Sequence, residues 1–302
     1  MSGKHIKRYI LMTIPLILMV LIVNIHNNNK DKNINDTDYK VEVVDEDEEQ
    51  RYILEEAVEE DNTNILSETY NNGYTEVFDV GEITNGILDI KYNGEMAGIV
   101  RVIGEKSTIN HYIFDDKPKR IGLTEGNGDY TIELYKYNGG SYIIEDRIDF
   151  KLKDSTKEMF TTSTINVDYA EYIDLIRDII NRNKDNSYEN TLDNIFEYIS
   201  EFDYDYDIAN KIYNREITVY EDNIGDTIEY KKGICSDFAR VMAASSRVMG
   251  IPAKLVYGEY GGRDQFHAWA EVNIGDEWII YDPTKNIKTT KDDNSYREIE
   301  IY

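Results

Sequence analysis

Apolar and polar positions alternate in short runs over about residues 75–153 of this chain. Leu88, Ile90 and Tyr92 form one such run, and alternation of this kind is typical of strands with one buried face. Turn signals rich in asparagine and glycine separate the runs, at 85–86, 93–94, 126–128 and 138–140. Six or seven short strands at this spacing predict a small antiparallel β-sandwich over residues 65–155.

Beyond this region the period lengthens, and apolar residues recur every three or four positions. Stripes over 172–180 and 192–202 predict two helices that each present one apolar face to a core. A third helix is expected over Cys235–Val248, because a glycine and a proline follow it as stop signals. Three alternating runs then predict strands, at 253–260, 267–274 and 277–282. The pattern over residues 160–302 therefore predicts an α+β domain.

The last two of these strands are expected to form a hairpin, because Gly275-Asp276 is a two-residue turn signal. Centring the turn there pairs Asn273 with Trp278, Glu271 with Ile280, Trp269 with Asp282, and His267 with Thr284. His267 and Asp282 then become diagonal neighbours on one face, with backbones about 7–8 Å apart, within reach of a histidine–carboxylate hydrogen bond. A slip of one residue would send Asp282 to the opposite face and abolish that contact.

Cys235 and His267 are the candidate nucleophile and base. Cys235 is the only cysteine in the chain, and His267 is the only histidine after His111. In the first turn of its helix, Cys235 would meet unpaired N–H groups and a dipole that favour a thiolate and can hold an oxyanion. A lone cysteine or histidine is more often a structural residue, but with Asp282 in register the three form a nucleophile, base and orienter. The polar stretch 207–233 is expected to be a loop that borders the active-site cleft.

Four motifs occur in the order found in the bacterial transglutaminase-like superfamily: GICSDFA at 233–239, GIPA at 250–253, HAWAEV at 267–272, and Trp278 with DPT at 282–284. The resemblance covers about residues 165–285. It implies the papain-like cysteine-protease superfold, with an antiparallel sheet packed on the catalytic helix and a Cys235-His267-Asp282 triad. It also implies acyl chemistry through a cysteine thioester. The superfamily includes cross-linkers, peptidases, glycan-removing amidases and inactive members, so the resemblance leaves the reaction open.

The oxyanion site departs from one branch of this superfamily. Animal transglutaminases resemble one another in using a tryptophan upstream of the cysteine, whereas Trp269 and Trp278 both lie downstream here. Tyr204 and Tyr206 are therefore candidate oxyanion donors, because a phenolic O–H can bond an oxyanion. The alternative is that both are packing residues that follow a helix. His111 has no apparent partner in the sequence and is interpreted as a surface strand residue.

The N-terminus carries a membrane signal. Lys4, Lys7 and Arg8 precede an uncharged apolar run over residues 9–25, and no small-residue cleavage pattern follows it. We expect residues 1–27 to be an uncleaved single-pass anchor that contacts the lipid bilayer, with a cleaved signal peptide as the alternative. The preceding basic residues place the N-terminus in the cytoplasm and the rest of the chain outside.

The formal net charge is −26, from 33 basic and 59 acidic residues, which is unfavourable for binding nucleic acid. Many of the acidic residues lie in 28–64, which we expect to be a solvated linker rather than a cation site or docking tail. One cysteine excludes an internal disulfide, and one cysteine with one histidine in the C-terminal domain makes a zinc site implausible. We expect no cofactor and no metal.

These features predict a membrane-anchored extracellular cysteine acyltransferase or amidase. It would attack an amide carbonyl of a protein or peptide at the cell surface, form a thioester at Cys235, and pass the acyl group to an amine or to water. Two alternatives stay open: a non-catalytic adhesion or scaffolding protein that keeps the fold, and a cysteine peptidase acting on cell-surface peptides.

Overall fold

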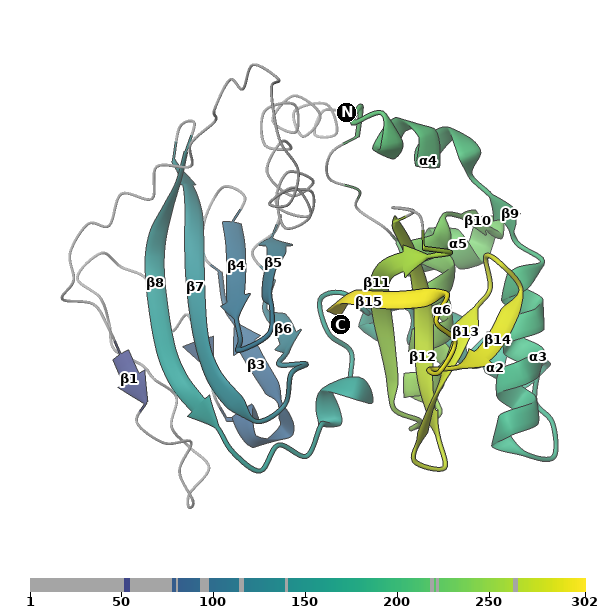
Figure 1. Ribbon diagram of the computed structural model, residues 1–302, viewed down its shortest axis with the longest axis horizontal. Coiled ribbons are helices and arrows are strands. Elements are labelled where there is room, and N and C mark those ends of the chain that lie inside the picture. Colours follow the sequence, from purple (N-terminus) through teal and green to yellow (C-terminus); the bar gives the residue numbers. More distant parts are fainter. Residues whose placement is uncertain are drawn as a thin grey trace.

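A computed structural model describes residues 52–54, 78–79, 81–92, 98–113, 117–138, 141–217, 220, 223–262 and 266–302. The expected anchor at 1–27 and all of the expected linker at 28–64 except 52–54 lie outside these residues. Within the described ranges, no helix has the length and apolar character needed to cross a bilayer. Figure 1 shows two regions side by side: the β region, residues 52–54 and 78–152, and the C-terminal region, residues 160–302.

The β region contains two sheets. The larger has the order β1-β8-β7-β4-β5 and the smaller has the order β2-β3-β6. Every pairing is antiparallel except that of β1 with β8. The strands are β1 (Tyr52–Leu54), β2 (Phe78–Asp79), β3 (Ile87–Ile90), β4 (Gly98–Ile103), β5 (Thr108–Ile113), β6 (Lys119–Gly122), β7 (Gly128–Asn138) and β8 (Ser141–Leu152), with a 3-10 turn at Ile83–Asn85.

Side chains from both sheets share one buried core. Leu88 and Ile90 come from the smaller sheet, and Val100, Ile132 and Leu134 come from the larger one. All five are almost fully shielded from solvent, so the alternation of the sequence corresponds to inward-facing rows on two packed sheets. The prediction of antiparallel β structure in this region is confirmed.

The C-terminal region places helices against one antiparallel sheet with the order β14-β13-β12-β11-β15. Phe238 and Met242 of the central helix share a buried core with Leu192, Ala268 and Ala270. A mixed helix and sheet arrangement is therefore confirmed for this region. Its elements are α2 (Ile173–Arg182), α3 (Tyr188–Ser200), β9 (Asp203–Tyr204), α4 (Tyr206–Tyr213), α5 (Ile224–Tyr230), β10 (Lys232–Gly233), α6 (Cys235–Val248), β11 (Ala253–Tyr260), β12 (Phe266–Ile274), β13 (Glu277–Asp282), β14 (Ile287–Thr290) and β15 (Tyr296–Ile301), with 3-10 turns at Glu158–Phe160 and Ala170–Tyr172.

The interpretation of 207–233 as a loop is wrong, because α4 and α5 form within it. Asp205 caps α4 by accepting hydrogen bonds from the backbone N–H groups of Asp207 and Ile208. Asn223 caps α5 in the same way. Side-chain capping of this kind satisfies N–H groups that a short helix leaves unpaired, and it stabilises helices in an otherwise polar stretch.

Polar contacts join the two regions. The hydroxyl of Thr124, which follows β6, donates to the carbonyl oxygen of Ile301 in β15 at 2.9 Å. His111 of β5 lies 2.7 Å, Nδ1 to Oδ1, from Asn166 in the connecting segment, and it is only 4 % exposed. The interpretation of His111 as a surface residue without a partner is therefore wrong, because the connecting segment and the ring of Tyr302 cover it. Burial lowers the pKa of His111 to about 4.

Candidate active site

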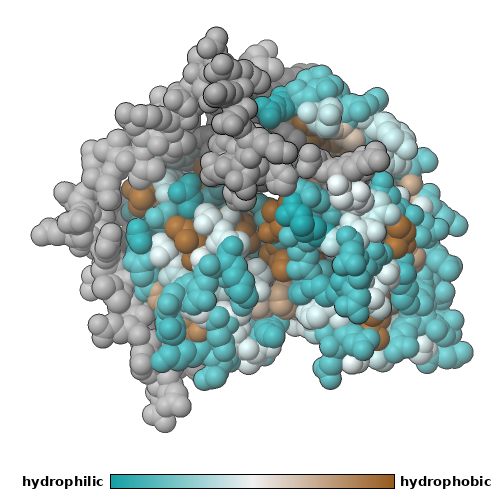
Figure 2. All heavy atoms as spheres, viewed as in Figure 1, coloured by the Kyte–Doolittle hydropathy of each residue, from teal (hydrophilic) through white to brown (hydrophobic). Residues whose placement is uncertain are grey.

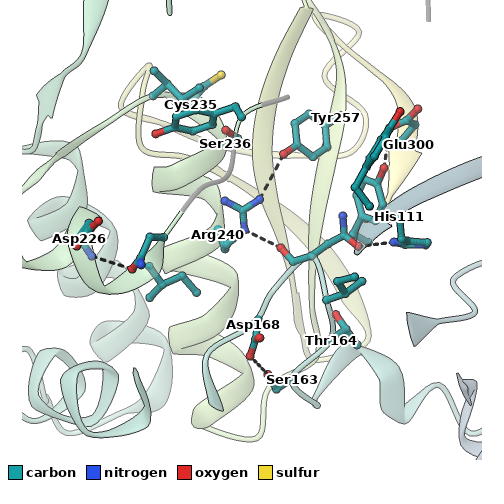
Figure 3. Close-up of a pocket in the computed structure, with 18 of the residues that line it drawn as sticks. His111, Ser163, Thr164, Asp168, Asp226, Cys235, Ser236, Arg240, Tyr257 and Glu300 are labelled. Carbon is teal, nitrogen blue, oxygen red and sulfur yellow. Dashed lines mark hydrogen bonds between the residues drawn. The ribbon is translucent and has the colours of Figure 1, made fainter. Parts of the chain in front are cut away.

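A cleft of about 1420 Å³ lies between the two regions, and Cys235 lines it (Figure 3). The β region contributes residues of β5 and β6 to its wall, and the C-terminal region contributes Tyr204, Tyr257 and Phe266. Figure 2 shows hydrophilic side chains over most of the visible coloured surface and hydrophobic side chains in the seam between the regions. The cleft is larger than the roughly 300–1,000 Å³ typical of small-molecule sites, so it is large enough for a polypeptide segment.

Cys235 is the first residue of α6, as predicted, and its thiol is free and partly exposed. The carboxylate of Asp237 fixes this helix start by accepting from the backbone N–H of Ile234 at 2.8 Å and from the hydroxyl of Tyr220 at 3.0 Å. Asp237 was not among the predicted site residues, although an acidic residue three positions after a helix cap is a recognisable signal. The cap holds the backbone N–H groups around Cys235 in place.

The hairpin has the predicted register. β12 and β13 pair Asn273 with Trp278 and Glu271 with Ile280, and the ladder ends at Ala270 and Tyr281. The predicted pairs of Trp269 with Asp282 and of His267 with Thr284 lie beyond its end. Gly275 and Asp276 have φ values of 57° and 70°, as a two-residue hairpin turn of the primed type requires.

This register brings the imidazole and the carboxylate together. His267 Nε2 lies 2.7 Å from Asp282 Oδ2, and both side chains are buried. Asp282 also accepts a hydrogen bond from the hydroxyl of Tyr296 at 2.9 Å and another from the backbone N–H of Lys285 at 3.2 Å. Three donors satisfy this fully buried carboxylate, so its orientation is fixed.

The pKa of His267 reflects opposing effects. Burial lowers it, whereas hydrogen bonds to Asp282 and Cys235, together with their charges, raise it to about 9. The imidazole therefore holds its proton at neutral pH. It also joins Cys235 to Asp282 in one hydrogen-bonded row, which can exchange a proton between sulfur and ring nitrogen.

The structure separates the two oxyanion candidates. Tyr204 is half-buried and hydrogen bonds with both the thiol and the backbone of Cys235. Burial first, and then the charge and thiol of Cys235, raise the pKa of Tyr204, whereas the backbone hydrogen bond lowers it. Tyr206 is 70 % exposed and packs its ring 5.0 Å from that of Tyr204. Of the pair, Tyr204 is the one beside the sulfur. Trp269 is fully buried within the hairpin core.

In the parts of the chain that the structure describes, no three His, Cys, Asp or Glu side chains lie close enough to hold a metal ion.

Comparison with known proteins gives one family match, which lies within the C-terminal region. The family model described as the transglutaminase-like superfamily matches residues 174–283, a span that includes Cys235, His267 and Asp282 and stops before Tyr296. No curated protein matches the chain.

Several solved structures are similar to parts of this chain. The crystal structure of a TGase is 24% identical with a TM-score of 0.33, covering 38% of this chain and 32% of that chain. Calcium-bound LapG from Legionella pneumophila is 15% identical with a TM-score of 0.35, covering 42% and 71%. The periplasmic domain of TgpA from Pseudomonas aeruginosa, bound to ethylmercury, is 13% identical with a TM-score of 0.31, covering 63% and 90%. The chain thus spans about a third of the TGase that it matches.

Proposed function

Residues 174–283 of this chain form a transglutaminase-like domain, and from that premise we propose that the protein is a cysteine acyltransferase or amidase. The observation that carries the proposal is the hydrogen-bonded row from Asp282 through His267 to Cys235 at the wall of a large cleft. Nucleophile, base and orienting carboxylate come from α6, β12 and β13, and this arrangement has the geometry of an activated thiol.

In the proposed reaction, the sulfur of Cys235 attacks an amide carbonyl carbon and the electron pair moves onto the carbonyl oxygen. The backbone N–H groups of the first turn of α6 and the hydroxyl of Tyr204 are the donors available to that oxyanion. The C–N bond then breaks, His267 gives its proton to the leaving amine, and a thioester forms. An amine or water then attacks the thioester carbon while His267 takes the proton of the incoming nucleophile, and the C–S bond breaks to return the thiolate of Cys235.

The substrate in this proposal is a polypeptide. The cleft volume of about 1420 Å³ favours it, because a small ligand would leave much of the cleft unfilled. We further propose that the reaction occurs at the outer face of a membrane to which residues 9–25 anchor the chain, which rests on the sequence alone. The net charge of −26 is unfavourable for binding a nucleic-acid partner.

Incubation with a primary-amine probe and a glutamine-containing protein tests the proposal. A transferase incorporates the probe, and a hydrolase releases ammonia from the glutamine or cleaves the backbone without incorporation. The Cys235→Ala variant is the control and is expected to do neither. Equal signals from the wild type and Cys235→Ala would mean that the fold serves adhesion or scaffolding instead.

A further inference from the structure

We infer that Tyr296, in the terminal strand β15, is a positioning residue that holds Asp282 toward His267. This inference rests on the proposed function. The hydroxyl of Tyr296 donates to Asp282 Oδ2 at 2.9 Å, and the same oxygen faces His267 Nε2 at 2.7 Å. Tyr296 lies beyond the matched span 174–283, so the family motifs do not include it.

The carboxylate of Asp282 is held at two points. The backbone N–H of Lys285 reaches Oδ1 at 3.2 Å, and Tyr296 and His267 share Oδ2. Without the phenolic donor, only a long backbone hydrogen bond and the imidazole itself would resist rotation of the carboxylate. Because a catalytic base depends on the orientation of its partner, this second hold bears on the chemistry and not only on packing.

An irregularity in the sheet positions the Tyr296 hydroxyl next to Asp282. The β11–β15 register shifts between Tyr257 and Gly258, and an added Cβ at Gly258 would lie 2.1 Å from the carbonyl oxygen of Arg297. Glycine therefore permits the close approach of β15 at the residue next to Tyr296. The Tyr296 ring then packs with centroids 4.8 Å from Tyr260 and 5.0 Å from Trp269. Its position is thus fixed by both backbone and ring packing.

Replacement of Tyr296 by phenylalanine keeps the ring and removes the donor. Asp282 would then lose one of its two holds, and its hydrogen bond to His267 would weaken. That hydrogen bond is a main cause of the raised pKa of His267, which burial alone would lower. In Tyr296→Phe, His267 is therefore expected to release its proton at a lower pH than in the wild type.

Two alkylating probes measure this release in the full-length chain. Iodoacetamide is neutral and iodoacetate is anionic, and the chain offers them a single cysteine. A cationic His267 attracts the anion, so the iodoacetate-to-iodoacetamide rate ratio falls as His267 loses its proton. The wild-type ratio should fall with a midpoint near pH 9. In Tyr296→Phe we expect a midpoint about one pH unit lower, a tenfold change in the protonation equilibrium.

Tyr260→Phe is the matched control. The Tyr260 ring packs against the rings of both Tyr296 and His267. Tyr260 is not among the donors to Asp282, which in the described residues are His267, Tyr296 and Lys285. Its midpoint should equal that of the wild type. Melting temperatures are measured in parallel, because a purely structural Tyr296 would lower the melting temperature and leave the midpoint in place. An unchanged or raised midpoint in Tyr296→Phe, or equal shifts in both variants, overturns the inference.

The same assay separates this inference from the proposed function. In the wild type, the iodoacetate-to-iodoacetamide rate ratio should fall in a step that the His267→Gln variant lacks. If the wild type shows no such step, the proposed function itself fails. If the wild type shows that step and Tyr296→Phe keeps the wild-type midpoint, only the role assigned to Tyr296 fails.

Discussion

Replacing Asp282 by asparagine preserves the shape of a fully buried side chain and removes its charge. Of the interactions that raise the pKa of His267 to about 9, the hydrogen bond to Asp282 is the largest. Without the carboxylate, two of the four interactions that raise the pKa are lost while burial remains, so the pKa of His267 should fall toward its ordinary value of 6.5. The change from about 9 to 6.5 is about 2.5 pH units, or about 3 kcal/mol at 1.36 kcal/mol per unit.

The sign of the resulting pH dependence follows from proton binding. The pKa of His267 is higher in the folded chain than in the unfolded chain, so folding favours the protonated ring. This contribution to stability is fully present below pH 6.5 and is lost as the pH rises through about 9. In Asp282→Asn the loss between these pH values should be absent.

Urea unfolding followed by tryptophan fluorescence measures the effect. Both tryptophans of the chain, Trp269 and Trp278, lie in the hairpin that carries His267 and Asp282, so the signal reports on this region alone. The free-energy difference between wild type and Asp282→Asn should be about 3 kcal/mol larger at pH 6 than at pH 9.5. A difference that is equal at the two pH values would refute the reasoning.

Three further predictions concern other parts of the molecule. Burial holds the pKa of His111 near 4, so the neutral ring stabilises the fold above pH 6.5 and this stabilisation is lost as the pH falls toward 4. In a series of unfolding measurements at decreasing pH, His111→Gln should therefore lack a loss of about 3 kcal/mol that the wild type shows. Identical pH dependence in the two proteins would contradict this prediction. Gly258→Ala should lower the unfolding free energy by about 1–3 kcal/mol, because the new methyl meets the Arg297 carbonyl; an unchanged urea midpoint would show that the strands separate freely. Tyr204→Phe should slow incorporation of the amine probe by about 100-fold while Tyr206→Phe leaves it unchanged, and equal rates for the two variants would exclude Tyr204 as a donor.

The hairpin was predictable because its signals are local. A two-residue turn and two alternating runs fix a register, and that register places His267 and Asp282 within hydrogen-bond distance. The position of α6 was predictable for the same reason. Its apolar face lies within the helix, and its stop signals, a glycine and a proline, follow just after it.

Contacts between distant segments could not be predicted in this way. His111 is buried by Asn166 and Tyr302, which lie far away in the sequence, and nothing in its own strand indicates burial. Tyr296 reaches Asp282 only because β15 adds to the edge of the sheet beside Gly258, a strand that the alternation pattern did not reveal. Long-range strand pairing depends on the closed fold and leaves a weak local signal.

Alkylation of the single cysteine tests the central claim most directly. Iodoacetamide is applied at pH 7 to full-length wild-type chain and to His267→Ala, with labelling of Cys235 followed by mass spectrometry. An activated thiol predicts rapid labelling of the wild type and a loss of about 10-fold or more in the variant, which lacks the imidazole that hydrogen bonds with the sulfur. Equal labelling rates in the two proteins would contradict the catalytic role of Cys235.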